Sequence, residues 1–211
     1  MDKLRESPDA SVREFLSALS TSDGSHAAVS AAAVSCGLGT SLLLMVASLP
    51  QTRSGSATDR KELLAATAVL IDVREQLLEA IETETVLRVY AARNMPQMSV
   101  AQRSERDAAI QLALRAAADV PLEVMRLCTL ALQQSRIVAR HCSRAAAAEV
   151  EFAVTLFRAG LAGARTNLES RIPSLTDVVY TAGVIDEIAR LNDEATVAAA
   201  AAEDAVRVQP A

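Results

Sequence analysis

The chain has 211 residues, of which 51% are hydrophobic, and it contains only 7 glycine and 6 proline residues. This composition excludes a disordered or collagen-like chain, and the length favours one domain over 1–211 rather than two. The formal net charge is −5, and the aromatic residues are only 3 Phe and 2 Tyr. Because nucleic-acid surfaces need clustered positive charge or stacking aromatic rings, we expect no nucleic-acid partner.

The three cysteines, Cys36, Cys128 and Cys142, stand far apart in the sequence. An odd and sparse set of this kind predicts reduced thiols and a cytoplasmic protein. Residues 1–22 carry several acidic side chains and no apolar leader, so secretion is not expected.

The N-terminal part of the chain predicts two helices. Ser11 and Glu14 form a capping box ahead of apolar residues, which predicts a short helix. The segment 26–49 carries no formal charge and is long enough to cross a bilayer. It is rich in hydroxyl side chains and has no lysine or arginine immediately beside it, so we expect no membrane partner. We expect instead a central helix that ends at Pro50 and is covered on all sides by other helices.

Apolar residues recur at three- and four-residue intervals through the rest of the chain. With a capping box at Ser99 and Gln102, this spacing predicts helices over 58–94 (one or two), 99–118, 122–141 and 145–167. Pro173 and residues 174–177 are expected to begin the last helix, which frays into an alanine-rich tail near Ala198. Pro121 is expected to start or to kink the helix over 122–141. The fold expected is therefore all-α, an antiparallel up-and-down bundle of long helices.

Small residues are concentrated in the uncharged helix, at Gly37, Gly39 and positions 31–33. Small side chains let the backbones of two helices approach closely. We therefore expect a homodimer with this helix near its interface.

Three stretches of the sequence resemble one family. Residues 113–126 (ALRAAADVPLEVMR) are similar to its segment alkeAasvPldv, and residues 148–167 are similar to a helix that ends in NVrIN. More faintly, residues 15–19 and the turn at 24–25 resemble its opening FL..la..tPGGGs. The family comprises the bacterial methenyltetrahydrofolate cyclohydrolases and the C-terminal domain of formiminotransferase-cyclodeaminase. The resemblance covers about 11–188 and implies a helical enzyme.

Enzymes of this family open or close a cyclic amidinium, which needs a group that moves a proton and a negative charge near the cationic species. The resemblance implies Glu149, at the Asp of a Ser-Asp pair, and Glu82, at a second family Asp, as catalytic candidates. Glu82 alternatively belongs to the solvated face of a long helix. His26 is a third candidate, either as a general base or as a residue that caps the turn.

Five positions are expected to bind the substrate: Gly24, Ser25, Ser143, Asn167 and Arg171. Gly24 and Ser25 are what remains of the family's glycine-rich turn, and Ser143 replaces an Asn. Asn167 could orient an amide or carbonyl group, or cap a helix end. Arg171, which replaces the second Asn of NVrIN, and Arg165 could meet a carboxylate on the ligand.

His141, Cys142 and Cys128 lack the spacing of a metal site, so we expect no metal and no bound cofactor. Adjacent helical residues point about 100° apart, so His141 and Cys142 do not form a nucleophile and base pair.

The sequence therefore predicts an enzyme that opens or closes a cyclic amidine or imine. Its small-molecule substrate is a tetrahydrofolate derivative or a metabolite of a specialised pathway. The alternative is a catalytically inactive helical dimer that binds a ligand or a partner protein.

Overall fold

The computed structural model describes residues 11–20, 27–81, 93–95 and 99–208. Within these ranges all regular structure is helical, which confirms the all-α prediction. The α-helices are α1 (Val12–Leu19), α2 (Ala27–Ser48), α3 (Ala57–Ile81), α5 (Val100–His141), α6 (Ala147–Arg171) and α7 (Val178–Arg207). The connections include the 3-10 turns η1 (Thr52–Ser54), η2 (Arg144–Ala146) and η3 (Ile172–Ser174).

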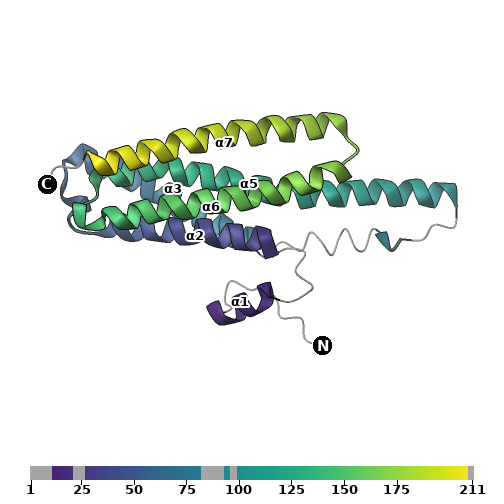
Figure 1. Cartoon of the computed structure of the whole chain (residues 1–211), viewed down its shortest axis with the longest axis horizontal. Coiled ribbons are helices and arrows are strands. Elements are labelled where there is room, and N and C mark those ends of the chain that lie inside the picture. The colour runs from purple at the N-terminus through teal and green to yellow at the C-terminus, as the bar shows by residue number, and fades with distance from the viewer. Residues whose placement is uncertain (1–10, 21–26, 82–92, 96–98, 209–211) are drawn as a thin grey trace.

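The long helices lie side by side and alternate in direction, which confirms the antiparallel bundle (Figure 1). α5 packs against α3, α6 and α7, whereas α2 packs chiefly against α6 and α3. α5 is therefore the central helix, and its N-terminal part extends beyond the ends of α6 and α7 (Figure 1).

α2 is not the fully covered helix that its uncharged sequence predicted. It meets α6, α3 and α5 on one side, but Ala28, Ala31, Leu38 and Met45 are exposed on the other. By length and composition, 28–48 could cross a membrane, and 50% of the tested window is buried inside the bundle. The prediction fails because composition records how apolar a helix is but not how many neighbours it has.

α2 and α6 cross closely because glycine lies on both helices at their contact. A Cβ added at Gly39 would lie 3.0 Å from the Ala153 carbonyl oxygen. A Cβ added at Gly160 would lie 2.8 Å from the Ala32 carbonyl oxygen and would overlap Cys36 Sγ. These distances leave no room for a side chain at either position.

The small residues expected at a dimer interface are thus divided between two faces. Gly39, Ala32 and Ala33 are buried within the bundle. Ala31 is exposed, and a Cβ added at Gly37 would meet nothing within 4 Å. Of the small residues expected at a dimer interface, Ala31 and Gly37 are therefore the ones that a partner could contact.

Cys36 and Cys128 form a disulfide that joins α2 to α5, so the prediction of reduced thiols is wrong for this pair. The two cysteines are 92 residues apart in the sequence, so the sequence did not indicate that both side chains lie in the same core. In the loop-closure account, a bond across so long a loop stabilises the fold by about 4–5 kcal/mol. Because disulfides are rare in cytosolic proteins, cysteine usage no longer supports a cytoplasmic location.

Pro121 lies inside α5 and does not begin a helix. Of the two roles expected for it, the helix start is therefore wrong, and the helices expected over 99–118 and 122–141 are one continuous helix. Proline removes one backbone hydrogen bond and usually breaks a helix. Here Ala117 and Ala118 before it, and Leu122 and Val124 after it, are all buried. Packing on both sides keeps the helix continuous, because most helical stability in proteins comes from tertiary contacts.

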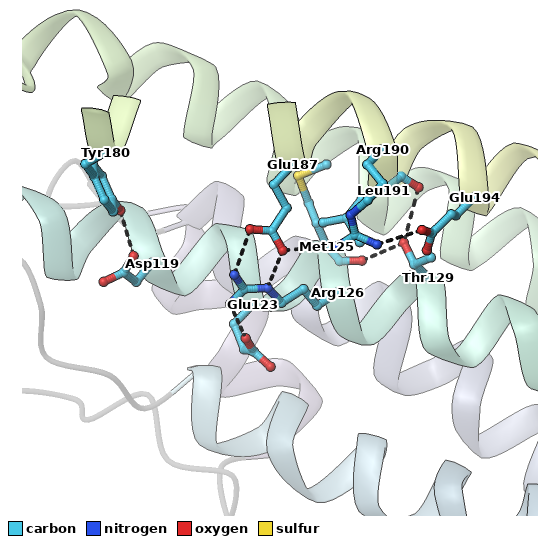
Figure 2. Close-up of polar contacts among 10 residues, drawn as sticks. All are labelled: Asp119, Glu123, Met125, Arg126, Thr129, Tyr180, Glu187, Arg190, Leu191 and Glu194. Carbon is cyan, nitrogen blue, oxygen red and sulfur yellow. Dashed lines mark hydrogen bonds and ion pairs between the residues drawn. The ribbon is translucent and has the colours of Figure 1, made fainter. Parts of the chain in front are cut away.

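α7 is held to α5 by polar contacts along their seam (Figure 2). Arg126 donates two hydrogen bonds to the Glu187 carboxylate, both 2.9 Å long. Tyr180 donates a 2.6 Å hydrogen bond to Asp119, and Arg115 lies 4.8 Å from the centre of the Tyr180 ring. These contacts fix the register of the two helices.

The alanine-rich end of α7 continues as a helix to Arg207, past the point near Ala198 where fraying was expected. Ala199, Ala202 and Val206 are buried in the bundle. Alanine favours the helix here and also fits a narrow interhelical space.

Gly160→Ala should destabilise the protein by roughly 1–3 kcal/mol, because the new methyl group overlaps Cys36 and the α2 backbone. Gly183→Ala in α7 is the matched control. Its Cβ meets nothing within 4 Å, so the substitution should stabilise the helix by about 1 kcal/mol. Urea unfolding monitored by circular dichroism measures the unfolding free energy of both variants. If the two substitutions changed it equally, the close packing of α2 against α6 would be contradicted.

Glu187→Gln should lower the unfolding free energy at neutral pH by about 0.5–1 kcal/mol. The hydrogen bonds from Arg126 hold the pKa of Glu187 below its ordinary value of 4.5. Its stabilising contribution is therefore complete above pH 4.5 and is lost as the pH falls through the lowered pKa. Unfolding measured between pH 7 and pH 3 should show the variant and the wild type converging in acid. The exposed Glu151→Gln serves as a control and should show little difference at any pH.

Candidate functional site

α6 carries three of the predicted site residues, but at opposite ends. Glu149 lies in its first turn, and Asn167 and Arg171 lie in its last two. The 18 residues between Glu149 and Asn167 span five turns, or about 27 Å, and place both side chains on the same side of the helix. One chain therefore does not bring the two ends together into a single pocket.

Glu149 lies one turn before Ala153, on the side of α6 that faces α2. The residue is partly buried, and its Oε2 is shielded from solvent without a hydrogen-bond partner in the described part of the chain. An unpaired and sheltered carboxylate oxygen is suited to accept a proton or to face a cation. Ser143 is partly buried at the same end of the bundle, just before η2.

Asn167 and Arg171 are joined by a 2.8 Å hydrogen bond from Arg171 Nε to Asn167 Oδ1. Arg171 is half-buried, and this burial lowers the pKa of its guanidinium. No described carboxylate forms an ion pair with it. A partly desolvated arginine that bonds to a neutral amide, and pairs with none of the described carboxylates, is suited to bind an anionic group.

The end of the bundle that holds Asn167 and Arg171 also holds the start of α2 and the end of α3. A Cβ added at Gly163 would lie 3.4 Å from Ala32 Cβ, so the first turn of α2 lies level with Asn167 in the antiparallel pair. α2 begins at Ala27 and α3 ends at Ile81. The predicted residues Gly24, Ser25, His26 and Glu82 lie outside the described residues.

A groove of about 390 Å³ lies between α6 and α7. Its lining residues are Arg158, Leu161, Ala162, Arg165, Thr166, Glu169, Asn192, Ala195 and Thr196. Arg165 donates a 2.7 Å bond to Glu169, and Arg158 pairs with Glu203. Both arginines are thus neutralised, and neither Glu149, Asn167 nor Arg171 lines the groove. The sequence did not single out the polar residues from α7, because their contribution depends on how the two helices pair.

His141 and Cys142 have structural contacts. His141 Nε2 lies 3.5 Å from Glu62 Oε2, and the Cys142 thiol donates to the Ala139 carbonyl at 3.3 Å. Hydrogen bonding by Arg140, with a smaller contribution from His141, lowers the pKa of Glu62. Among the described residues, no group of three or more His, Cys, Asp or Glu is placed to hold a metal ion.

Comparison with known proteins agrees with this architecture. The fold is that of the helical cyclodeaminases: the formiminotetrahydrofolate cyclodeaminase of Thermotoga maritima matches with a TM-score of 0.82 at 16% identity, over 94% of this chain and 96% of that one. The sequence model of the formiminotransferase-cyclodeaminase family matches residues 11–190. The chain belongs to this family. It is also similar to a methenyltetrahydrofolate cyclohydrolase of Methylorubrum extorquens, with 27% identity over 186 residues, 87% of this chain and 89% of the relative.

Arg171→Met should leave the unfolding free energy unchanged or raise it by up to about 1 kcal/mol, because it removes a half-buried charge that has no ion-pair partner among the described residues. Arg165→Met, which breaks an exposed ion pair with Glu169, should change it by less than about 1 kcal/mol. Urea unfolding of the two variants and the wild type measures these changes in the unfolding free energy. A marked loss of stability on replacing Arg171 would show that its guanidinium is a structural element.

Proposed function

We propose that this protein opens or closes the cyclic amidine of a tetrahydrofolate derivative. The observation that carries the proposal is the family match across residues 11–190. It is supported by the relative named methenyltetrahydrofolate cyclohydrolase, which pairs with this chain over most of both lengths. Glu149 Oε2, which has no hydrogen-bond partner within the ranges that the structure describes, supplies a group with suitable chemistry.

In the ring-opening direction, the oxygen of a water molecule forms a bond with the amidinium carbon. Glu149 accepts the proton that the water releases, and its negative charge favours the cationic substrate. The bond between this carbon and one ring nitrogen then breaks, and the proton passes from Glu149 to that nitrogen. The product is a formamide and a free amine. The second proton of the water, which stays on the added oxygen until the C–N bond breaks, is released to solvent with the positive charge of the amidinium, so atoms and charge balance. Cyclodeamination uses the same kind of proton transfer when ammonia leaves a formimino group and the ring closes.

Asn167 and Arg171 are assigned to substrate binding in this proposal. The Asn167 amide accepts the hydrogen bond from Arg171 Nε, which leaves the other guanidinium N–H groups available to a carboxylate of the ligand. In a folate such a group is present on the glutamyl tail. Ser143, Gly24, Ser25, His26 and Glu82 remain predicted site residues on the strength of the sequence resemblance.

Two departures from the family pattern support a second substrate class. The glycine-rich turn has a single glycine, Gly24, and the Ser-Asp pair has become Ala148 and Glu149. Both changes alter the shape of a pocket and retain an acid, which suits the same ring chemistry on a different small molecule. The alternative is a catalytically inactive dimer that binds a ligand or a partner protein. Turnover measurements distinguish it from an enzyme that acts on either substrate class.

Glu149→Gln should lower the turnover of methenyltetrahydrofolate about 100-fold or more, because the amide removes the proton acceptor and the charge. The measurement is the decay of the substrate's absorbance with each purified protein, compared with the uncatalysed decay. Glu151→Gln, an exposed change two residues away on the same helix, should retain wild-type activity.

If the wild type fails to accelerate the decay of methenyltetrahydrofolate, this compound is not the substrate. If it accelerates the decay and Glu149→Gln does so equally, Glu149 has no part in the proton transfer.

A further inference from the structure

The groove between α6 and α7 is separate from the residues assigned to the proposed reaction. Its volume of about 390 Å³ is within the range of small-molecule sites, at the lower end of that range. Neither Glu149, Asn167 nor Arg171 is among its lining residues. The charged and polar lining of the groove is therefore not explained by the ring chemistry.

The groove exists because α7 packs mainly against α5 and contacts α6 much less. The first half of α7 buries Val184, Ile188 and Leu191, whereas Ala195 is the buried residue of α7 that lines the groove. Ala162 of α6 contributes another single methyl group to the lining. Packed helix axes lie about 8–10 Å apart, and such short side chains leave part of the space between them unfilled.

Two ion pairs stand at different levels of the groove. Arg158 of α6 pairs with Glu203 of α7 and bridges the helices at one end. At the other end Arg165 donates a 2.7 Å hydrogen bond to Glu169, within α6. Asn192 of α7 is level with Glu169 in the antiparallel pair, because 192 and 203 are as far apart as 158 and 169. The two arginines are two turns apart, or about 10 Å.

The charges of these four side chains cancel, so a ligand with a net charge gains no overall attraction in the groove. A ligand that carries one positive and one negative group is complementary to it. The pair Arg165–Glu169 is the one that can open, since its side chains are 44% and 45% exposed. Exposed pairs of this kind contribute little to stability. Each member can therefore exchange its partner for the opposite charge of a ligand.

Two neutral groups beside Arg165 and Glu169 await hydrogen-bond partners. The partly buried Asn192 amide and the Thr166 hydroxyl line the groove, and neither side chain bonds to another residue in the described ranges. Thr196, by contrast, donates a 2.8 Å bond to the Asn192 backbone carbonyl. An amide and a hydroxyl can each donate and accept, so together they suit a head group that has both donors and acceptors.

We infer that the groove binds a free α-amino acid with an apolar side chain. The ligand's carboxylate accepts hydrogen bonds from the Arg165 guanidinium, and its ammonium group donates to Glu169. Both charges of an α-amino acid are attached to one carbon, and residues one turn apart on a helix are neighbours, so the two contacts form together. Asn192 and Thr166 complete the binding of the head group.

The floor of the groove selects the side chain of the ligand. Leu161, Ala162 and Ala195 form an apolar surface between the two ion pairs. A side chain about the length of phenylalanine or leucine covers this surface and removes it from water. A charged side chain would instead reach Arg158 and Glu203, which already satisfy each other.

Saturation-transfer NMR with L-phenylalanine as the probe tests the site. The wild type should bind it saturably, with a Kd of about 1 mM, as expected for a small ligand in an open groove. Two matched compounds each lack one charge: 3-phenylpropanoate has no ammonium group, and 2-phenylethylamine has no carboxylate. Each should bind about 10-fold more weakly, because one charged hydrogen bond is lost.

Two pairs of variants locate the binding. Arg165→Met should weaken the binding of L-phenylalanine about 10-fold. Arg207→Met, which breaks an exposed pair with Asp204 on α7 outside the groove, should leave it unchanged. Ala162→Leu fills the floor and should abolish binding. Ala159→Leu, at an exposed position of α6 that does not line the groove, should have no effect.

Each other outcome overturns the inference. Absence of saturable binding to the wild type excludes the site, and equal binding of 3-phenylpropanoate would make the groove an anion site. Equal effects of Ala162→Leu and Ala159→Leu would place the ligand elsewhere. Loss of binding in Arg171→Met but not in Arg165→Met would assign the amino acid to the end of α6. None of these readouts uses turnover, so a failure of the proposed function leaves this test unaffected.

Discussion

The close contact between α2 and α6 is the constraint on which the rest of the structure depends. Gly39 and Gly160 allow the two backbones to meet, and the disulfide from Cys36 to Cys128 ties the same point of α2 to the central helix α5. Because the contact is antiparallel, it sets the start of α2 beside the end of α6. It also leaves the opposite side of α2 uncovered. The same contact therefore forms the end of the bundle that holds Asn167 and Arg171 and leaves Leu38 and Met45 exposed.

Charged groups in this bundle divide into those with partners and those without. Along the α5–α7 seam, Arg126 and Glu187 satisfy each other (Figure 2), and their role is to hold α7 in register. Glu149 and Arg171 lack a charged partner in the described part of the chain, although both are at least partly buried. Keeping such groups has a cost in stability, and that cost is understandable where a substrate supplies the missing partner.

Prediction from the sequence succeeded where the signal was local and failed where it depended on neighbours. The capping boxes at Ser11 and Ser99 mark the starts of α1 and α5. The sequence divided α5 into two helices at Pro121, because the packing that keeps the helix continuous there comes from residues distant in sequence. Cys36 and Cys128 were expected to be reduced for the same reason. The site prediction named Glu149, Asn167 and Arg171 from motif positions, but motif order says nothing about the 27 Å or so of helix between them.

The sequence by itself determined the helical class, most helix limits and the family, because periodicity, caps and motif residues act over a few neighbouring positions. Only the tertiary structure decided which helix is central, which cysteines pair, and which side of α2 stays exposed. Those properties depend on contacts between residues that are far apart along the chain. The same distinction applies to the site: sequence indicated its chemical groups, and the length and direction of α6 decided that one chain holds them at opposite ends.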